Sequence, residues 1–495
     1  MDAIRGNNQM KQQNYIKGQW LDGSGSLLTS VSPIDGSSLW QGKMSNREDV
    51  HAAIEAARSA FMSWAKLPRQ QRSEICKEFQ RLLRENSEEL ADLIHRESGK
   101  PLWESRTEVG SMIGKIDLSL DAIRERAGDK QNQIAAGTAQ LTHRPHGVVA
   151  IFGPYNFPGH LPNGHIVPAL LAGNTLVFKP SEQCPAVGEF MVQLWQQAGI
   201  PTGVINLIQG ARDTGTLLAA EPDIDGLFFT GSSVTGESLH RQFAGKPGKI
   251  LALEMGGNNP LVVHKISDMR AAVYNTIQSA FVSAGQRCTC ARRLIVVDDR
   301  EGKKFLESLC EATEKLLVSA TDENAFIGPV ISESAATALL AAQDGLQAMG
   351  GTALVAMKQD AKVPALVSPG IIDVTDVASL RDTEYFGPLL QVIRVSSFEK
   401  AIEVANKTQF GLASGLFSQD SELWQQFYLS SRAGVVNWNK PLTGASGAAP
   451  FGGIGASGNH RPSAWYAADY CAYPVASLVS ETLETPDTLA PGVSL

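Results

Sequence analysis

The chain has 495 residues, of which 43% are hydrophobic and 19% are charged, a composition typical of a globular protein with a buried core and about two to four domains. Asp and Glu total 51 against 43 Lys and Arg, so the net charge of −8 argues against nucleic acid or an anionic membrane as the main partner. No stretch approaches the roughly 18 apolar residues of a membrane span, the first 14 residues are polar, and the six cysteines are too sparse for a disulfide framework. We therefore expect a cytoplasmic protein.

The elements expected along the chain begin with a polar lead-in before Tyr15 and helical spacing of apolar residues from Asp49 to Glu97. Residues 129–144 lack a clear period, so we expect an extended strand or flap that leaves the main body. From residue 147 short apolar runs alternate with helical segments, which is typical of parallel sheets covered by helices. The expected strands cover 147–152, 175–178, 204–208, 225–229, 259–264 and 293–297, and the expected helices cover 186–198, 271–284 and 302–317. The sequence predicts two α/β domains in series, joined near Gly256-Gly257.

A glycine-containing turn follows the expected strand 225–229. It consists of Gly231, Ser232, Ser233, Val234, Thr235 and Gly236. Its backbone amides would open a helix, where free N–H groups and the helix dipole favour a pyrophosphate. Another glycine pattern, at 453–458, has neither a strand before it nor a helix after it, so it does not qualify as a dinucleotide fingerprint. The sequence leaves open whether the turn at 231–236 binds phosphate or only joins a strand to a helix.

Two charged residues, Lys179 and Glu182, come just after the expected strand 175–178. Side chains beyond the carboxyl end of such a strand lie at the edge where open α/β sheets bind ligands. The alternative is a helix cap at Ser181 with solvated charges on either side. The residues alone do not decide between these interpretations.

The candidate nucleophile is Cys288, which follows Arg287 and a turn at Gly285. A reactive thiolate needs a positive neighbourhood and partial exposure, and the arginine could supply the charge. A buried, inert cysteine carries equal weight, and no pair of Cys or His has the spacing of a metal site. The other cysteines lack this context and are expected to be structural; apart from Cys290 they are Cys76, Cys184, Cys310 and Cys471.

The candidate base is Glu254, which lies in the otherwise apolar run 251–257. Desolvation in such a run should raise the pKa of the carboxyl, and a raised pKa suits a general base near neutral pH. A buried glutamate is costly unless it is paired or functional, and here we favour a functional role.

These motifs occur in a definite order, at residues 15–20, 154–158, 179–182, 229–236, 254–257, 285–288, 384–388, 406 with 410–412, and 450–453. In that order they resemble the NAD(P)-dependent aldehyde dehydrogenase superfamily over essentially the whole chain. The resemblance implies an α/β fold with two open α/β domains, a Rossmann-like cofactor domain and a catalytic domain, and a small β oligomerisation flap. It implies an NAD-binding domain over 1–128 and 147–256, a catalytic domain over 257–455, and a flap with a C-terminal segment over 129–146 and 470–495.

The resemblance also implies catalytic roles. Cys288 would attack the aldehyde carbonyl, and the resulting oxyanion would be held by the side-chain amide of Asn156 and the backbone amide of Cys288. Glu254 would activate the water that hydrolyses the thioester. Because this glutamate is present, the acyl group should go to water.

The implied cofactor is NAD, and no metal is expected. Lys179 and Glu182 would bind the adenosine ribose, and a carboxylate there favours a free 2′-hydroxyl, so we expect NAD rather than NADP. Glu384 would hold the nicotinamide ribose, Phe386 would pack near the nicotinamide, and the turn 231–236 would cover the pyrophosphate. The family often has a second acidic residue where this chain has Thr383.

The substrate is harder to infer. The strings at 153–165, 437–444 and 458–466 resemble a branch of the superfamily that oxidises an acidic semialdehyde. A substrate with carboxylates calls for cationic or amide-rich contacts. The candidates are Arg287, His160, His165, Thr443 and Ser446. The family often has Lys where this chain has Gly455, which affects the loop next to them.

The resemblance further implies a homodimer or a dimer of dimers, paired through the flap and the C-terminal segment. Three alternatives stay open. The substrate could be another acidic semialdehyde, such as that of succinate or glutamate; the chain could be a non-catalytic structural relative; or it could be a cysteine hydrolase that needs no cofactor.

Overall fold

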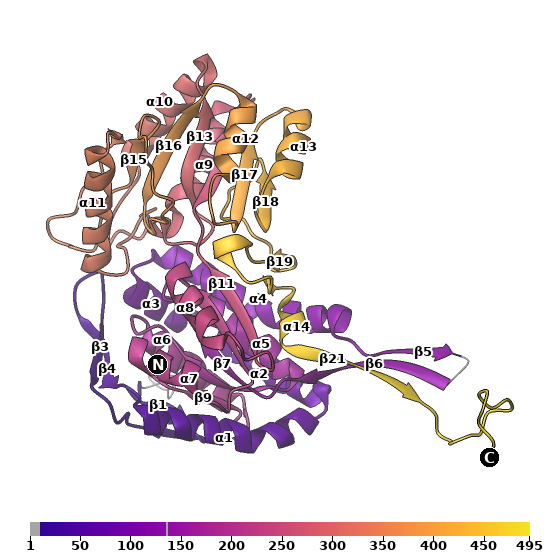
Figure 1. Ribbon diagram of the computed structural model, residues 1–495. Helices are drawn as coiled ribbons and strands as arrows, with labels where there is room; N and C mark the ends of the chain where they lie inside the picture. The colour runs from indigo at the N-terminus through magenta and orange to yellow at the C-terminus, as the bar shows by residue number, and fades with distance from the viewer. Residues whose placement is uncertain (1–9, 135–136) are drawn as a thin grey trace.

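The computed structural model describes residues 10–134 and 137–495. It has two lobes, each built on an open seven-stranded sheet, and a three-stranded ribbon that projects from one of them (Figure 1). This arrangement confirms the predicted fold class. The predicted lead-in before Tyr15 lies largely outside the described residues.

The first sheet has the strand order β11-β10-β7-β8-β9-β1-β2. Its parallel strands are β7 (Val148–Phe152), β8 (Thr175–Lys179), β9 (Ile205–Leu207), β10 (Gly226–Gly231) and β11 (Ile250–Met255), and β1 (Asn14–Ile16) and β2 (Gln19–Leu21) add an antiparallel edge. The chain leaves β7 toward β8 and returns to its other side at β10, so the strand order reverses between β7 and β10. Open α/β sheets bind ligands beyond the carboxyl ends of the strands at such a reversal.

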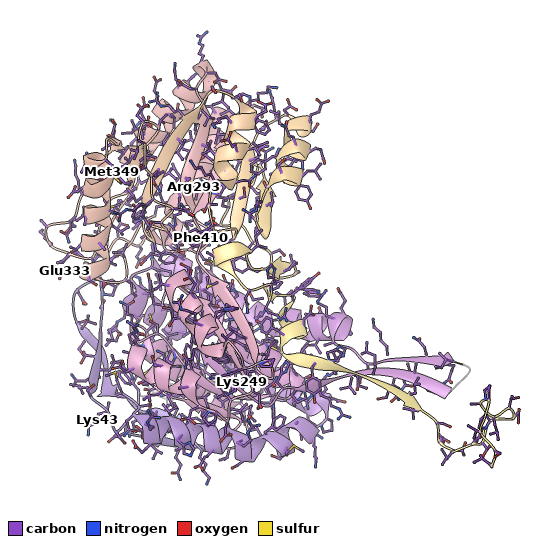
Figure 2. The ribbon with its side chains drawn as sticks, in the orientation of Figure 1. Lys43, Lys249, Arg293, Glu333, Met349 and Phe410 are labelled. Atoms are coloured by element: carbon purple, nitrogen blue, oxygen red, sulfur yellow. The ribbon has the colours of Figure 1, made fainter. Side chains whose placement is uncertain are left out.

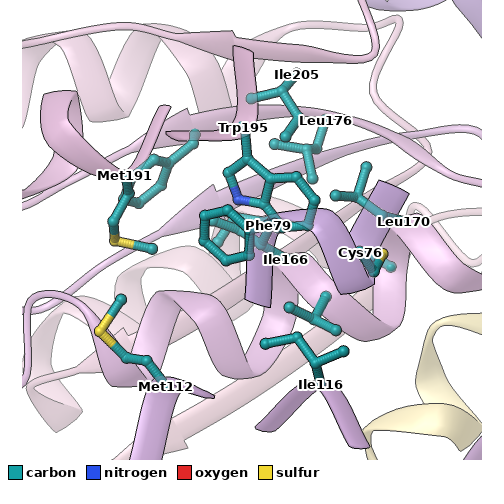
Figure 3. Close-up of a cluster of buried hydrophobic side chains, with 14 of the residues drawn as sticks. Cys76, Phe79, Met112, Ile116, Ile166, Leu170, Leu176, Met191, Trp195 and Ile205 are labelled. Carbon is teal, nitrogen blue, oxygen red and sulfur yellow. The ribbon is translucent and has the colours of Figure 1, made fainter. Parts of the chain in front are cut away.

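The helices of this lobe are α1 (Arg47–Lys66), α2 (Arg69–Glu85), α3 (Ser87–Ser98), α4 (Leu102–Arg126), α5 (His160–Ala172), α6 (Pro185–Gln197), α7 (Arg212–Ala220) and α8 (Ser233–Phe243). The helical stretch expected over 49–97 is divided into α1, α2 and α3. Pro68 interrupts it once, because the residue before a proline avoids helical dihedrals, and Asn86 interrupts it again. The core between α2 and α6 is built around Phe79 and Trp195, whose stacked rings lie 3.8 Å apart (Figure 3).

The second sheet has the order β14-β15-β16-β13-β12-β17-β18, in which only β14 is antiparallel to its neighbour. Its strands are β12 (Asn259–Val263), β13 (Ala291–Val297), β14 (Thr352–Val355), β15 (Gly370–Asp373), β16 (Leu389–Val395), β17 (Ala413–Phe417) and β18 (Val435–Trp438). The accompanying helices are α9 (Met269–Phe281), α10 (Arg300–Glu314), α11 (Glu333–Ala348), α12 (Phe398–Asn406) and α13 (Ser421–Ser430). Arg293 and Phe410 lie at the end of this lobe that faces the first one (Figure 2).

Two short antiparallel pairs lie outside the two large sheets: β3 (Leu27–Val31) with β4 (Ser38–Lys43), and β19 (Pro450–Phe451) with β20 (Ser463–Ala464).

The projecting ribbon joins distant parts of the sequence. It contains β5 (Lys130–Ile134), β6 (Gly137–Pro145) and β21 (Ala472–Val479), and β21 pairs with β6 along its whole length (Figure 1). A short helix, α14 (Ala467–Tyr470), leads from the first lobe into β21. Pairing between subunits through this ribbon stays a prediction. None of the helices in the described residues has the length and apolar character needed to cross a membrane.

Candidate active site

The loop that carries Cys288 follows α9 through a tight turn over Val282–Gly285. Ser283, Ala284 and Gly285 all have positive φ, and a side chain at Gly285 would meet the carbonyl oxygen of Gly387 at 2.1 Å. The last position therefore needs glycine. This tight turn brings the following residues to the face of the lobe that meets the first sheet.

Hydrogen bonds from Asn259, which the sequence did not predict, fix this loop. The Nδ2 atom of Asn259, at the start of β12, donates to the carbonyl oxygens of Cys288 at 2.7 Å and Cys290 at 2.9 Å. No pattern distinguishes this asparagine from Asn258 beside it, so its role is visible only in three dimensions.

Cys288 and Glu254 face each other across the junction of the lobes. The Sγ atom of Cys288 lies 3.6 Å from Oε1 of Glu254, which comes from the end of β11. Burial raises the pKa of the Glu254 carboxyl to about 7. Burial also raises the pKa of the Cys288 thiol well above its usual value, and the carboxylates of Glu254 and Glu384 raise it further. The thiol therefore needs a base to become a nucleophile, and Glu254 is within reach of it.

The expected positive neighbourhood of Cys288 is wrong in one respect. The Arg287 guanidinium turns away to bind the Glu104 carboxylate at 2.7 Å and the Ser283 hydroxyl at 2.8 Å. Glu104 lies on α4, 183 residues earlier in the chain, and it neutralises the arginine. Arg287, although next to Cys288 in the sequence, is therefore not the group that provides a positive charge for the thiol.

A buried chain of hydrogen bonds runs from Glu254 to the base of the ribbon. The Thr230 hydroxyl donates to Oε2 of Glu254 at 3.2 Å, and His165 lies between Thr230 at 3.0 Å and the Tyr470 hydroxyl at 2.7 Å. Burial, followed by Lys115, lowers the pKa of His165 to about 3, so its ring is neutral. A neutral ring has one donor and one acceptor, so Nε2–H donates to Thr230 and Nδ1 accepts from Tyr470. This series of hydrogen bonds thus fixes the Glu254 carboxylate through its Oε2 atom.

Asn156 lies in the loop between β7 and α5, where its Nδ2 donates to the carbonyl oxygen of Gln286 at 2.9 Å. The structure therefore places this amide against the loop of Cys288, and its role at the oxyanion stays a prediction. It is buried and does not line the cavity described below. One of its two N–H bonds is used by Gln286.

The turn at 231–236 joins β10 to α8, with Ser232 as the helix cap. The Ser232 hydroxyl accepts from the backbone N–H of Thr235 at 3.3 Å. A side chain at Gly231 would meet the Phe229 ring at 2.5 Å, and one at Gly236 would meet Sδ of Met255 at 2.1 Å. The turn lies next to the reversal of strand order, and it includes Ser233 and Val234, the latter 75% exposed.

Lys179 and Glu182 lie together beyond the end of β8. The Nζ atom of Lys179 donates to the carbonyl oxygens of Pro180 at 2.9 Å and Gly210 at 2.7 Å, and it lies 3.8 Å from the Glu182 carboxylate. Burial lowers the pKa of the lysine, whereas the glutamate side chain is half-exposed. Lys179 is therefore buried and bound to carbonyl oxygens rather than solvated, whereas Glu182 keeps much of its contact with solvent.

Glu384 and Phe386 come to the same junction from the second lobe. The Glu384 carboxylate lies 3.6 Å from the Arg292 guanidinium, and burial raises the pKa of this glutamate. Its Oε1 has no hydrogen bond within the described residues. A side chain at Gly256 would collide with Oε2 at 1.8 Å, so this position needs glycine. The Phe386 ring lies 5.2 Å from the same arginine.

A cavity of about 310 Å³ opens beside Cys288 and Glu254. All the candidate substrate residues line it: Arg287, His160, His165, Thr443 and Ser446. Burial, followed by neighbouring cations, lowers the pKa of His160 to about 3, so this ring is neutral like that of His165. The sequence analysis missed Lys115, Thr230 and Phe451, which also line the cavity. The described residues contain no cluster of three or more His, Cys, Asp or Glu that could hold a metal ion.

Comparisons with known proteins agree with this geometry. An N-succinylglutamate 5-semialdehyde dehydrogenase from Hahella chejuensis is 56% identical over 488 residues, covering 98% of this chain and 100% of that protein. Among solved structures, an E. coli NADP-dependent enzyme matches with a TM-score of 0.90 and 31% identity, covering 96% of this chain and 99% of that one. The NAD+ complex of an aldehyde dehydrogenase from Bacillus cereus matches with a TM-score of 0.89 and 28% identity, covering 95% and 96%. The model of the aldehyde dehydrogenase family matches residues 20–474, so the chain is an aldehyde-oxidising oxidoreductase that belongs to this family.

Proposed function

We propose that the protein oxidises N-succinylglutamate 5-semialdehyde to N-succinylglutamate with NAD as the acceptor, in bacterial arginine catabolism. The observation that carries the chemistry is the 3.6 Å approach of the Cys288 thiol to the Glu254 carboxylate at the wall of a cavity of about 310 Å³. The choice of substrate is supported by the 56% identity to a dehydrogenase of that name over the whole length of both chains.

The residues at the junction fit a dinucleotide. The family uses NAD(P), and here the turn at 231–236 offers a helix N-terminus to a pyrophosphate. The buried Oε1 of Glu384, which lacks a hydrogen bond within the described residues, suits a ribose hydroxyl. Lys179 and Glu182 would hold the other ribose. When bound, NAD supplies the acceptor for the hydride that leaves the substrate carbon.

The steps performed by the chain follow from the geometry. Glu254 takes the Cys288 proton, and Sγ adds to the aldehyde carbon to give a thiohemiacetal. The side-chain amide of Asn156 and the backbone amide of Cys288 stabilise the oxyanion. After oxidation to the thioester, Glu254 passes the thiol proton to solvent and then takes a proton from water, which attacks the acyl carbon. The acid leaves, and Glu254 returns its proton to the departing thiolate of Cys288.

The deciding experiment is NADH formation by the purified protein with NAD and a set of semialdehydes. We expect the highest kcat/KM with N-succinylglutamate 5-semialdehyde. A preference for succinate or glutamate semialdehyde would keep the mechanism and discard the substrate. Turnover of an ester without NAD, together with no reduction of NAD by any aldehyde, would favour a cofactor-free hydrolase.

Replacing Asn156 by alanine removes one oxyanion donor and the bond to Gln286. We expect kcat/KM for the aldehyde to fall by about 10²–10³-fold. The affinity for NAD, measured by fluorescence titration, should stay within about twofold, because Asn156 contacts the Cys288 loop rather than the turn at 231–236. A fall of less than about threefold would contradict the assignment.

Replacing Glu182 by glutamine tests the choice of cofactor. The carboxylate repels a 2′-phosphate at this position, so the variant should use NADP better, with the kcat/KM ratio of NAD to NADP falling by about tenfold. Glu237, which pairs with Arg241 on α8, offers a matched control, and E237Q should leave the ratio unchanged. An unchanged ratio in E182Q would remove this residue from cofactor selection.

A further inference from the structure

The cations around the substrate cavity differ in how their charge is balanced. Arg287 is paired with Glu104, and Lys100, behind the cavity wall, is paired with the buried carboxylate of Glu108. The two histidines of the wall are neutral. Among the cations that line the cavity, within the described residues, Lys115 alone has no carboxylate partner.

The position of Lys115 is fixed by its helix. It lies on α4 between Met112 and Ile116, which are anchored in the hydrophobic core (Figure 3). Its side chain is only 4% exposed, and its Nζ donates to the carbonyl oxygen of Ala464 at 3.1 Å. Ala464 has a φ of 59°, a conformation that is strained for alanine. Burial lowers the pKa of Lys115 to about 8, because the carbonyl bond does not offset the loss of solvent around the ammonium.

We propose that Lys115 binds a carboxylate of the substrate and thereby selects acidic aldehydes over uncharged ones. An ammonium that is desolvated and unpaired gains from an anion that enters the same cavity. Cys288 lines this cavity too, so one molecule can present its aldehyde to Sγ and its carboxylate to Nζ. The inference rests on the proposed function, since it names the residue that gives that function its preference for acidic substrates.

The test compares K115M with the unchanged enzyme on two aldehydes, N-succinylglutamate 5-semialdehyde and uncharged hexanal. Methionine keeps much of the volume of lysine and removes its charge. We expect the ratio of kcat/KM for the acidic aldehyde over hexanal to fall by about 10–100-fold, and activity on hexanal to stay within about threefold. K115R should recover part of the ratio. The inhibition constant of glutarate, a diacid that cannot react, should rise by a similar factor in K115M.

The matched control is the same substitution at Lys66, an exposed residue at the end of α1 that does not line the cavity. K66M should keep both the ratio and the glutarate inhibition. A preference for acidic aldehydes that survives in K115M would overturn the role of Lys115 and leave the proposed function intact. No such preference in the unchanged enzyme would overturn the proposed function itself. An equal loss with both aldehydes in K115M would also contradict selection by charge.

Discussion

Replacing Cys288 by alanine is expected to lower aldehyde oxidation by about 10⁴-fold or more, because no other thiol of the described residues lines the cavity. The loss should appear in kcat, measured as NADH formation. NAD should still bind, since the residues proposed to hold it do not depend on the sulfur atom. A variant that still forms NADH at a tenth of the normal rate would rule out a thioester on Cys288.

The chain offers a matched control for this experiment. Cys290 lies two residues further on, but its Sγ is buried and points to the carbonyl oxygen of Val282 at 3.9 Å. C290A should keep most of the activity, with a small loss of stability from the vacated volume. If C290A lost as much activity as C288A, disruption of the loop rather than loss of the nucleophile would explain both.

Replacing Glu254 by glutamine is expected to separate acylation from hydrolysis. The variant should form about one equivalent of NADH per site and then stall, because no base is left to activate water. The burst should itself be slow, because Glu254 also takes the proton of Cys288. General bases contribute about 10²–10⁴-fold, so the steady-state rate should fall by a factor in that range. Rapid mixing with quantification of the burst measures both phases. Undiminished steady-state turnover would exclude Glu254 as the base.

The raised pKa of Glu254 also sets the direction of the pH dependence. The carboxyl acts as a base only when it is deprotonated, and burial raises its pKa to about 7. The hydrolytic rate should therefore fall about tenfold per pH unit below 7 and level off above it. The residual rate of E254Q should lack this inflection. A rate that stays constant from pH 5 to pH 8 would contradict the assignment.

The sequence predicted those features that depend on local pattern. The alternation of apolar runs and helices predicted the four parallel strands β7 to β10 of the first sheet and the two central strands β12 and β13 of the second, because these strands are buried on both faces. It did not predict β11 or β14 to β18, some of which are partly exposed. Cys288 and Glu254 were found because a cysteine after a turn and a glutamate in an apolar run are locally conspicuous. The structure shows that they meet, which the sequence could not show, because Glu254 lies in β11 of the first sheet and Cys288 in the loop before β13 of the second.

Long-range pairing explains what the sequence missed. Arg287 is neutralised by Glu104 of a distant helix, so its charge does not reach the thiol as its position beside Cys288 suggested. Lys115 looks like an ordinary solvated lysine on an amphipathic helix until the Ala464 segment covers it. Tyr470 carries no catalytic signal, and its contact with His165 arises only because α14 folds back onto the first lobe.

The direction of the hydrogen bonds behind Glu254 has a consequence for the order of events in turnover. Thr230 donates to Oε2, and Oε1 is the oxygen that faces Cys288, so the thiol proton passes to Oε1. The same atom must therefore serve the thiol first and water later. Oε1 has to release the proton from the first half of the cycle before it can accept one in the second. The two halves of catalysis then alternate at a single oxygen, and water cannot be activated while that oxygen still holds the proton of the thiol.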